Sequence, residues 1–195
     1  MSIATARLTL EEYLNRGDES EKHCELVAGC LFEMPPESPQ NAEIAIQLLL
    51  IFAQFVVTPR LLRCKDTEIV VSGSRTTVRL PDLMVLTEEL ADILYDSGRS
   101  TILSDMPPPA LVVEVVSPGK VNQDRDYRYK RSEYAARGIA EYWIVDPQIS
   151  KVTVLTLNEG LYEESVFAGD QAIVSLVFSQ LQLTANQVFD NQING

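Results

Sequence analysis

Hydrophobic and polar positions along the chain follow two periodicities, one typical of helices and one typical of strands. The longest largely apolar stretch, residues 41–57, begins after Ser38 and Pro39, which form a helix-start signal, so it predicts a largely buried helix. Short runs rich in β-branched residues predict strands. The predicted strands are residues 24–27, 30–34, 67–71, 77–86, 110–116, 141–145, 151–157 and 161–167. Shorter helices are predicted at residues 10–16, 88–94, 123–137 and 184–189.

Turn signals join three pairs of these strands into predicted hairpins. The first pair is joined through Ala28-Gly29, the second through Ser72-Gly73-Ser74 and the third through Asn158-Glu159-Gly160. The sequence shows no internal repeat, linker or low-complexity tract. We therefore expect residues 1–195 to form one mixed α/β domain.

One carboxylate interrupts the most apolar of these strands. Glu114 lies within the run Ala110-Leu111-Val112-Val113-Glu114-Val115-Val116, which is typical of a strand that is buried on both faces. A buried carboxylate without a partner must be protonated or find a cation. We therefore expect Glu114 to be functional or specifically paired, next to a positive charge.

Asp82 is a second candidate carboxylate. It heads the apolar stretch at residues 83–86, although a Pro-Asp pair is also an ordinary mark of a turn or strand start. Together, Asp82 and Glu114 would share a hard divalent cation, magnesium or alternatively manganese, which takes oxygen ligands and keeps several waters. Such a cation polarises a phosphate and lowers the pKa of its bound water. The pair therefore indicates metal-dependent phosphodiester chemistry.

Lys130 falls within the predicted helix at residues 123–137, where it shares one face with Tyr127 and Tyr134 at spacing i, i+3, i+7. If the tyrosines pack inward, Lys130 points inward too, and could orient the attacking water and neutralise charge in the transition state. Two alternatives remain. Lys130 either only satisfies Glu114 as a buried ion pair, or is a solvated residue paired with Asp126.

Charge limits the classes of function. The chain has a formal net charge of −12 and a pI near 4.5, which argues against a general affinity for nucleic acid. Residues 118–137 are an exception, with six basic residues against three acidic ones. The candidate nucleic-acid contacts in this segment are Lys120, Arg125 and Arg128, and a solvated helix face is the alternative interpretation.

Cysteine and histidine are scarce. The three cysteines lack Cys-x-x-Cys spacing, which favours a reduced compartment, and the single histidine, His23, cannot build a multi-histidine metal site. No signal sequence opens the chain, and the nearly apolar stretch at residues 44–57 is too short to cross a bilayer. We expect a cytoplasmic protein without a membrane partner.

Several motifs, taken together, resemble one family. They are Glu25-Leu26-Val27-Ala28-Gly29, Glu33-Met34-Pro35-Pro36, Pro81-Asp82, Leu111-Val112-Val113-Glu114-Val115-Val116-Ser117-Pro118, Asp126-x-x-x-Lys130-x-x-x-Tyr134 and Gly138-Ile139-Ala140-Glu141-Tyr142-Trp143-Ile144-Val145-Asp146-Pro147. In this order and spacing, over residues 23–147, they resemble the Uma-two family of putative restriction endonucleases, a branch of the PD-(D/E)XK nuclease superfamily.

The resemblance implies a restriction-endonuclease-like domain of α/β class, with a mixed sheet. Its core, residues 23–147, would run helix-strand-strand-strand-helix-strand, followed by an extra hairpin and a short helix in residues 148–195. The three consecutive core strands would be those around Val70, Val85 and Val113.

The resemblance also implies roles for site residues. Asp82 and Glu114 would be metal ligands, with the main-chain carbonyl of Val115 as a third, and Lys130 would be the catalytic lysine. The superfamily's lysine lies two residues after the glutamate, where this chain has Val116, so Lys130 would have to reach the site from the adjacent helix. Further candidate carboxylates are Glu25 and Asp126.

Three functions follow from these features. The first is a magnesium-dependent endonuclease that hydrolyses DNA through a metal-activated water, as a homodimer where both strands of a duplex are cut. The second keeps the nuclease fold without the chemistry, as a binding or assembly module with a protein partner, and is favoured by the negative charge and by Val116. The third is a phosphodiesterase acting on small nucleotides, which would cleave dinucleotides without affinity for a duplex.

Overall fold

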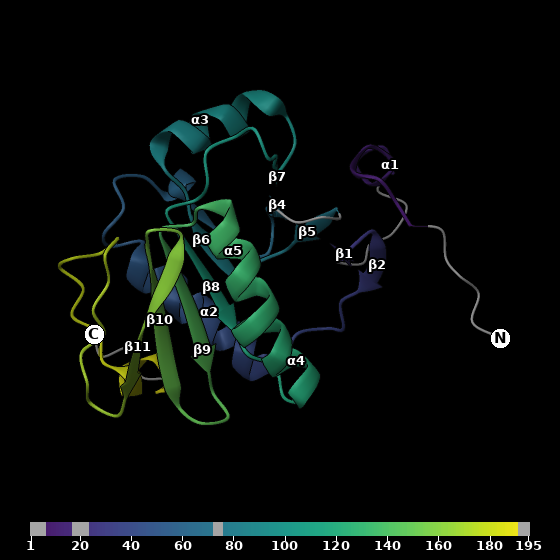
Figure 1. Ribbon diagram of the computed structural model, residues 1–195. Helices are drawn as coiled ribbons and strands as arrows, with labels where there is room; N and C mark the ends of the chain where they lie inside the picture. The colour runs from purple at the N-terminus through teal and green to yellow at the C-terminus, as the bar shows by residue number, and fades with distance from the viewer. Residues whose placement is uncertain (1–6, 17–23, 72–75, 191–195) are drawn as a thin grey trace.

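The computed structural model describes residues 7–16, 24–71 and 76–190, which fold into two mixed β-sheets flanked by helices (Figure 1). The helices are α1 (Leu10–Leu14), α2 (Pro39–Phe52), α3 (Glu88–Ser97), α4 (Lys120–Asp124), α5 (Arg131–Arg137) and α6 (Ala185–Phe189), with a 3-10 turn η1 (Pro59–Leu61) and a π-helical turn η2 (Arg125–Lys130). The strands are β1 (Cys24–Val27), β2 (Cys30–Glu33), β3 (Leu62–Arg63), β4 (Glu68–Val71), β5 (Thr77–Arg79), β6 (Leu83–Val85), β7 (Thr101–Ile102), β8 (Leu111–Val115), β9 (Glu141–Asp146), β10 (Lys151–Asn158) and β11 (Leu161–Ala168).

The larger sheet has six strands in the order β11-β10-β9-β8-β6-β3. Its central strands β8 and β9 run parallel, whereas the other neighbours are antiparallel. Parallel neighbours need a crossover connection, and the continuous helical segment of α4, η2 and α5 supplies it. The smaller sheet has five strands in the order β2-β1-β5-β4-β7.

Helices cover both faces of the larger sheet. Phe52 of α2 packs on one face, where its ring meets Trp143 of β9 edge-on with 5.5 Å between the ring centroids. Tyr134 of α5 packs on the opposite face with Val112 of β8. Figure 1 shows α4 and α5 in front of this sheet and α2 behind it. Strand β8 is therefore buried on both faces, as its composition predicts.

Local signals place the helix starts correctly. Thr9 and Thr184 each form a capping box at the first residues of α1 and α6, and Ser38 caps α2 by accepting a hydrogen bond from the amide of Asn41. The strand pairs β1–β2 and β10–β11 form antiparallel hairpins, as predicted. The predicted turn at residues 72–74 and the helix stop at Gly17 lie outside the described residues.

Two predicted elements, a helix and a strand, end or divide differently in the structure. Helix α2 ends at Phe52 rather than at residue 57, because Phe52 is its last buried side chain and the exposed Phe55 and Val57 give a longer helix no packing support. The predicted strand at residues 77–86 is two strands, β5 and β6, which belong to different sheets. Pro81 lies between them and cannot donate a main-chain hydrogen bond to a sheet neighbour.

The split strand changes the predicted core. The strands around Val85 and Val113, β6 and β8, are neighbours in the larger sheet. The strand around Val70, β4, belongs to the smaller sheet instead, where it pairs with β5. The break between β5 and β6 has a consequence for the site, since Asp82 lies in it.

Candidate functional site

Glu114 lies in the middle of β8, opposite Ile144 of β9, and is 3% exposed. Its two carboxylate oxygens have different partners on the helix above. The hydroxyl of Tyr134 donates to Oε1 at 2.6 Å, and Nζ of Lys130 lies 2.8 Å from Oε2. The cation that the burial of Glu114 requires is therefore present within the chain.

Lys130 is shared by three carboxylates. Besides Glu114, its Nζ lies 3.3 Å from Oε1 of Glu25 and 3.6 Å from Oδ1 of Asp126. Its side chain is 1% exposed. Burial lowers the pKa of Lys130, but the three negative charges outweigh burial and raise it above the ordinary value. Lys130 is thus a permanently charged centre of this cluster.

A π-helical turn arranges the helical side of the cluster. The predicted helix at residues 123–137 begins earlier, at Lys120, and widens into η2. Such single turns are frequent at functional sites. Both Asp126 and Lys130 are buried on the cluster side, and Asp126 also binds Nε of Arg125 at 3.0 Å. The inward orientation of Lys130 and Tyr134 agrees with the prediction.

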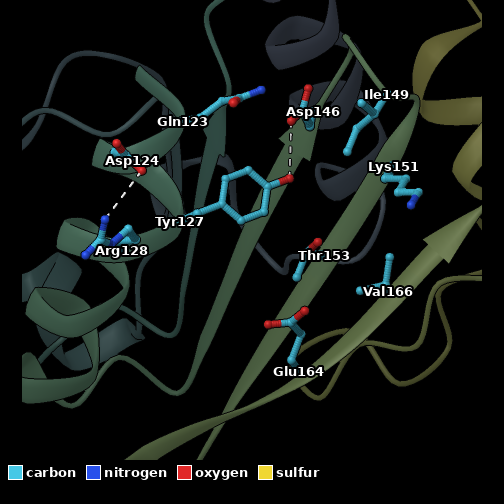
Figure 2. A pocket seen from close by; sticks show the side chains of 10 residues that line it. All are labelled: Gln123, Asp124, Tyr127, Arg128, Asp146, Ile149, Lys151, Thr153, Glu164 and Val166. Atoms are coloured by element: carbon cyan, nitrogen blue, oxygen red, sulfur yellow. Dashed lines mark hydrogen bonds and ion pairs between the residues drawn. The ribbon is translucent and has the colours of Figure 1, made fainter. Parts of the chain in front are cut away.

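Tyr127 has a different environment from the one expected. It faces a cavity of about 410 Å³ between the helical segment and strands β9 to β11, where its hydroxyl donates to Asp146 Oδ2 at 3.3 Å (Figure 2). The cavity is lined by Gln123, Asp124, Tyr127, Arg128, Asp146, Ile149, Lys151, Thr153, Glu164 and Val166. The lining mixes both signs of charge with apolar side chains and includes no residue of the carboxylate cluster.

Glu25 lies in β1 of the smaller sheet, and its second partner is Arg79 of β5. Arg79 was not predicted as a site residue. Nη1 of Arg79 lies 2.8 Å from Oε2 of Glu25, and its Nε and Nη2 bind both oxygens of Glu133 at 2.8 and 2.9 Å. Arg79 is 2% exposed. The sequence carries only a weak signal for it, since Arg79 lies between Val78 and Leu80 but close to Thr77 and Asp82.

Asp82 is fixed to the residue after Glu114. Its Oδ2 accepts a hydrogen bond from the main-chain amide of Val115 at 2.6 Å. Its Oδ1 lies 3.0 Å from Nζ of Lys65, which also pairs with Glu37. Lys65 and Glu37 were not predicted, and both lie outside regular elements, where no periodicity marks them.

The main-chain carbonyl of Val115 points to the same region. It accepts a hydrogen bond from Nδ2 of Asn41 at 3.3 Å, and the same amide nitrogen lies 3.3 Å from Oγ of Ser117. Asn41 is 2% exposed and belongs to the first turn of α2. One end of α2 and the end of β8 thus meet beside Asp82.

The pKa values of the two glutamates in the cluster shift in opposite directions. Burial raises the pKa of Glu114 to about 7, which Lys130 opposes and the negative charges of Asp82 and Asp126 reinforce. Burial would also raise the pKa of Glu25, but the positive charges of Lys130 and Arg79 outweigh it and lower that pKa to about 2. Glu25 is therefore a fixed counter-ion, whereas Glu114 can exchange a proton near neutral pH.

The candidate ligand atoms are all oxygens, which are the donors that a hard cation prefers. Within residues 7–16, 24–71 and 76–190, no group of three or more acidic, histidine or cysteine side chains is arranged to hold a metal. The available set is two carboxylates, of Asp82 and Glu114, with the carbonyl of Val115. Magnesium is typically bound by only one or two protein carboxylates and keeps several waters, so this smaller oxygen set fits it.

The three predicted nucleic-acid contacts differ in accessibility. The side chains of Lys120 and Arg128 are 83% and 69% exposed, and both lie near Asp124, at 3.1 and 3.7 Å. Arg125 is instead 22% exposed and is held by Asp126. Two of the three cations can therefore face a polyanion, whereas Arg125 serves the cluster.

No helix in the described part of the chain is long and apolar enough to cross a membrane.

Comparisons with known proteins agree with the fold. A family model, Uma2, described as "Putative restriction endonuclease", matches residues 10–186. A solved structure with a similar fold is that of a putative nuclease of the DUF820 family from Anabaena variabilis, with a TM-score of 0.70 and 18% identity over 93% of this chain and 97% of that chain. At this identity the likeness shows the fold alone. None of the curated proteins compared with the chain matches it.

Proposed function

Because the chain belongs to the Uma2 family of putative restriction endonucleases, we propose that it is a metal-dependent endonuclease that hydrolyses phosphodiester bonds of DNA. The observation that supports this most directly is the pairing of Asp82 with the amide of Val115, which puts a second carboxylate beside Glu114 at the end of β8. Asp82, Glu114 and the carbonyl of Val115 would hold magnesium or manganese. When bound, such an ion polarises a phosphate and lowers the pKa of its water.

The surrounding residues would prepare the ligands. Lys130 balances the charge of Glu114, and the hydroxyl of Tyr134 fixes the rotation of that carboxylate through Oε1. The amide of Val115 orients Asp82 in the same way through Oδ2. Preorganised ligands of this kind lose little free energy to rearrangement when a substrate arrives.

The burial and pairing of Lys130 favour a positioning role over direct contact with the substrate. It is 1% exposed and already shared by three carboxylates. In this position its positive charge lowers the pKa of Glu114 and so favours the ionised form of that carboxylate, against the effect of burial. The predicted catalytic role of Lys130 is thus proposed as an electrostatic one, acting through Glu114.

The experiment is a plasmid-nicking assay with magnesium or manganese. Wild-type protein should convert supercoiled DNA to nicked or linear forms, and Asp82→Ala or Glu114→Ala should lower the rate at least about 100-fold. Lys151→Met, which removes an exposed charge from β10, is the matched control and should stay within about threefold of wild type. Undiminished cutting by both alanine variants would falsify the assignment of the ligands.

A binding or assembly module that retains only the fold is the second candidate. Two observations favour it, the net charge of −12 and the complete pairing of Lys130 within the chain. The two functions separate cleanly in a test of metal binding. A module of this kind would bind no Mn²⁺ dependent on Asp82, and it would leave both plasmid DNA and dinucleotides intact.

We include a homodimer in the proposal, because cutting both strands of a duplex needs two active sites. A dimer should give linear DNA in a single binding event, whereas a monomer should accumulate nicked circles first. Light scattering of the purified protein, with and without DNA, measures the state directly.

A further inference from the structure

Lys65 is an unpredicted cation on the outer side of Asp82. It lies in the connection between β3 and β4, and its Nζ pairs with Oδ1 of Asp82 at 3.0 Å and with Glu37. Its backbone φ is +51°, a left-handed conformation that costs a lysine free energy and that is typically kept only where the surroundings require it.

Lys65 and Lys130 hold the two candidate ligands in different ways. Lys130 is 1% exposed and buried between its carboxylates, whereas the side chain of Lys65 is 31% exposed. An amine with access to water leaves its ion pair more readily than a buried amine does, because water can solvate the separated charge. Lys65 is therefore the exchangeable cation of the two.

The two carboxylate oxygens of Asp82 also differ in how easily their partners can leave. Oδ2 is held by the main-chain amide of Val115, which cannot move without breaking the end of β8. Oδ1 is held by the partly exposed amine of Lys65. An incoming cation would therefore find Oδ1 the easier of the two to take.

We infer that Lys65 and a divalent cation compete for Oδ1 of Asp82, so that metal loading releases the amine of Lys65 from this carboxylate. The inference rests on the proposed function, since it takes Asp82 as a metal ligand. The resident amine neutralises Asp82 and Glu37 until the metal replaces it. The released amine then pairs with Glu37 alone, at the edge of the site, where a phosphodiester anion would meet it.

The first test measures Mn²⁺ affinity by calorimetry at fixed ionic strength, without DNA. Lys65→Met removes the competing charge and should tighten Mn²⁺ binding about fivefold. This is the change in affinity expected when the metal no longer has to displace one partly exposed ion pair. Lys65→Arg keeps a cation and should bind Mn²⁺ no more tightly than wild type. Lys151→Met is the matched control for loss of an exposed positive charge, and its affinity should stay within twofold of wild type.

The second test follows Lys65 itself by acetylation with an amine-reactive reagent and peptide mass spectrometry. In wild type, saturating Mg²⁺ should at least double the labelling of Lys65 and leave that of Lys151 unchanged. In Asp82→Asn, labelling of Lys65 without Mg²⁺ should already equal that of wild type with Mg²⁺, and it should not respond to Mg²⁺. A Lys65→Met variant that does not fold leaves this second measurement to decide the question.

The outcomes separate the inference from the proposed function. If wild type binds Mn²⁺ and Asp82→Asn does not, but Lys65→Met has wild-type affinity and Lys65 labelling ignores Mg²⁺, only the competition is overturned. If Asp82→Asn binds Mn²⁺ as wild type does, Asp82 is no ligand and both proposals fall. Tighter binding in Lys65→Met together with metal-dependent labelling supports both.

Discussion

Glu114 and Glu141 are both buried carboxylates on the two central strands of the larger sheet, yet they have opposite kinds of partner. The register pairs Leu111 with Glu141 and Glu114 with Ile144, so the two glutamates point to opposite faces of the sheet. They are 3% and 0% exposed. Burial alone does not distinguish them, and the difference lies in what neutralises each charge.

Glu141 is surrounded by neutral donors. Its oxygens accept hydrogen bonds from Nε1 of Trp143 at 2.6 Å, from Oγ of Ser175 at 2.7 Å and from the main-chain amides of Leu176 and Val177. Several donors of this kind stabilise a carboxylate without another charge. Glu141 therefore fastens the segment after β11 to the sheet, which is a structural task.

Glu114 instead belongs to a cluster in which acids and cations share partners. Lys130 serves Glu25, Glu114 and Asp126 at once, while Arg79 also binds Glu25 and Arg125 also binds Asp126. The comparison teaches that a buried carboxylate with charged, shared partners is the stronger candidate for a functional site, whereas neutral donors, most of them from one neighbouring segment, indicate a structural task.

The largest expected effect is on the cleavage rate, which should fall when Glu114 is replaced but not when Glu141 is replaced. Glu114→Gln should lower the metal-dependent cleavage rate at least about 100-fold, because it removes a proposed ligand. Glu141→Gln should keep cleavage within about threefold of wild type at 20 °C while lowering the free energy of unfolding by about 2 kcal/mol. Cleavage assays and urea denaturation of both variants check this. Equal losses of activity would show that the comparison does not divide function from structure.

Lys130→Met should destabilise the fold by about 4 kcal/mol, because three buried carboxylates lose their shared cation. Urea denaturation measures the change, and Lys120→Met is the matched control, since that side chain is 83% exposed and should cost less than about 0.5 kcal/mol. Adding Glu114→Gln to Lys130→Met should recover part of the loss. A double variant that is simply additive would speak against a shared charge cluster.

The two glutamates that share Lys130 should give opposite pH dependences of stability. The folded-state pKa of Glu25 is lowered from 4.5 to about 2, so Glu25 contributes about 3 kcal/mol above pH 4.5, which is lost as the pH falls toward 2. The pKa of Glu114 is raised to about 7, so its ionisation reduces stability as the pH rises from about 4.5 to 7.

Chemical denaturation of wild type, Glu25→Gln and Glu114→Gln between pH 3 and 8 measures both slopes. The difference in free energy of unfolding between wild type and Glu25→Gln should shrink toward low pH. Relative to Glu114→Gln, wild type should lose stability as the pH rises toward 7. Parallel curves for the two variants would contradict the opposite shifts.

The smallest expected effect concerns the neutral donor to Glu114. Tyr134→Phe removes the 2.6 Å hydrogen bond to Oε1 and should lower the free energy of unfolding by about 1 kcal/mol. It should also raise the pKa of Glu114, because the hydroxyl stabilises the ionised form. Tyr129→Phe, at a side chain that is 58% exposed, is the control and should have no measurable effect.

Much of the fold was predictable because its signals are local. Thr9, Ser38 and Thr184 each cap a helix within three residues, and the hairpin β10–β11 follows from alternation around one turn. The split between β5 and β6 was missed, because an apolar run does not show which of two sheets each half will join. The end of α2 was missed for a similar reason, since packing decides it.

The candidate site was predictable in part. Glu114 interrupts a long apolar run, which made it recognisable, whereas Arg79 lies between threonines and the Pro81-Asp82 pair and has no such context. Lys65 and Glu37 are 28 positions apart outside regular elements, and nothing in their neighbourhoods marks them. A contact between two such segments depends on how the whole chain folds.

The sequence by itself determined that Glu114 would be buried, because the apolar residues around it make a strand with no exposed face. It also determined that this carboxylate would need partners, since burial of a lone charge is too costly. Only the tertiary structure decided that cations are among these partners, and which ones. The π-helical turn brings Lys130 to Glu114, and the connection after β3 brings Lys65 to Asp82. Burial follows from local composition, whereas pairing between distant side chains follows from how the elements pack.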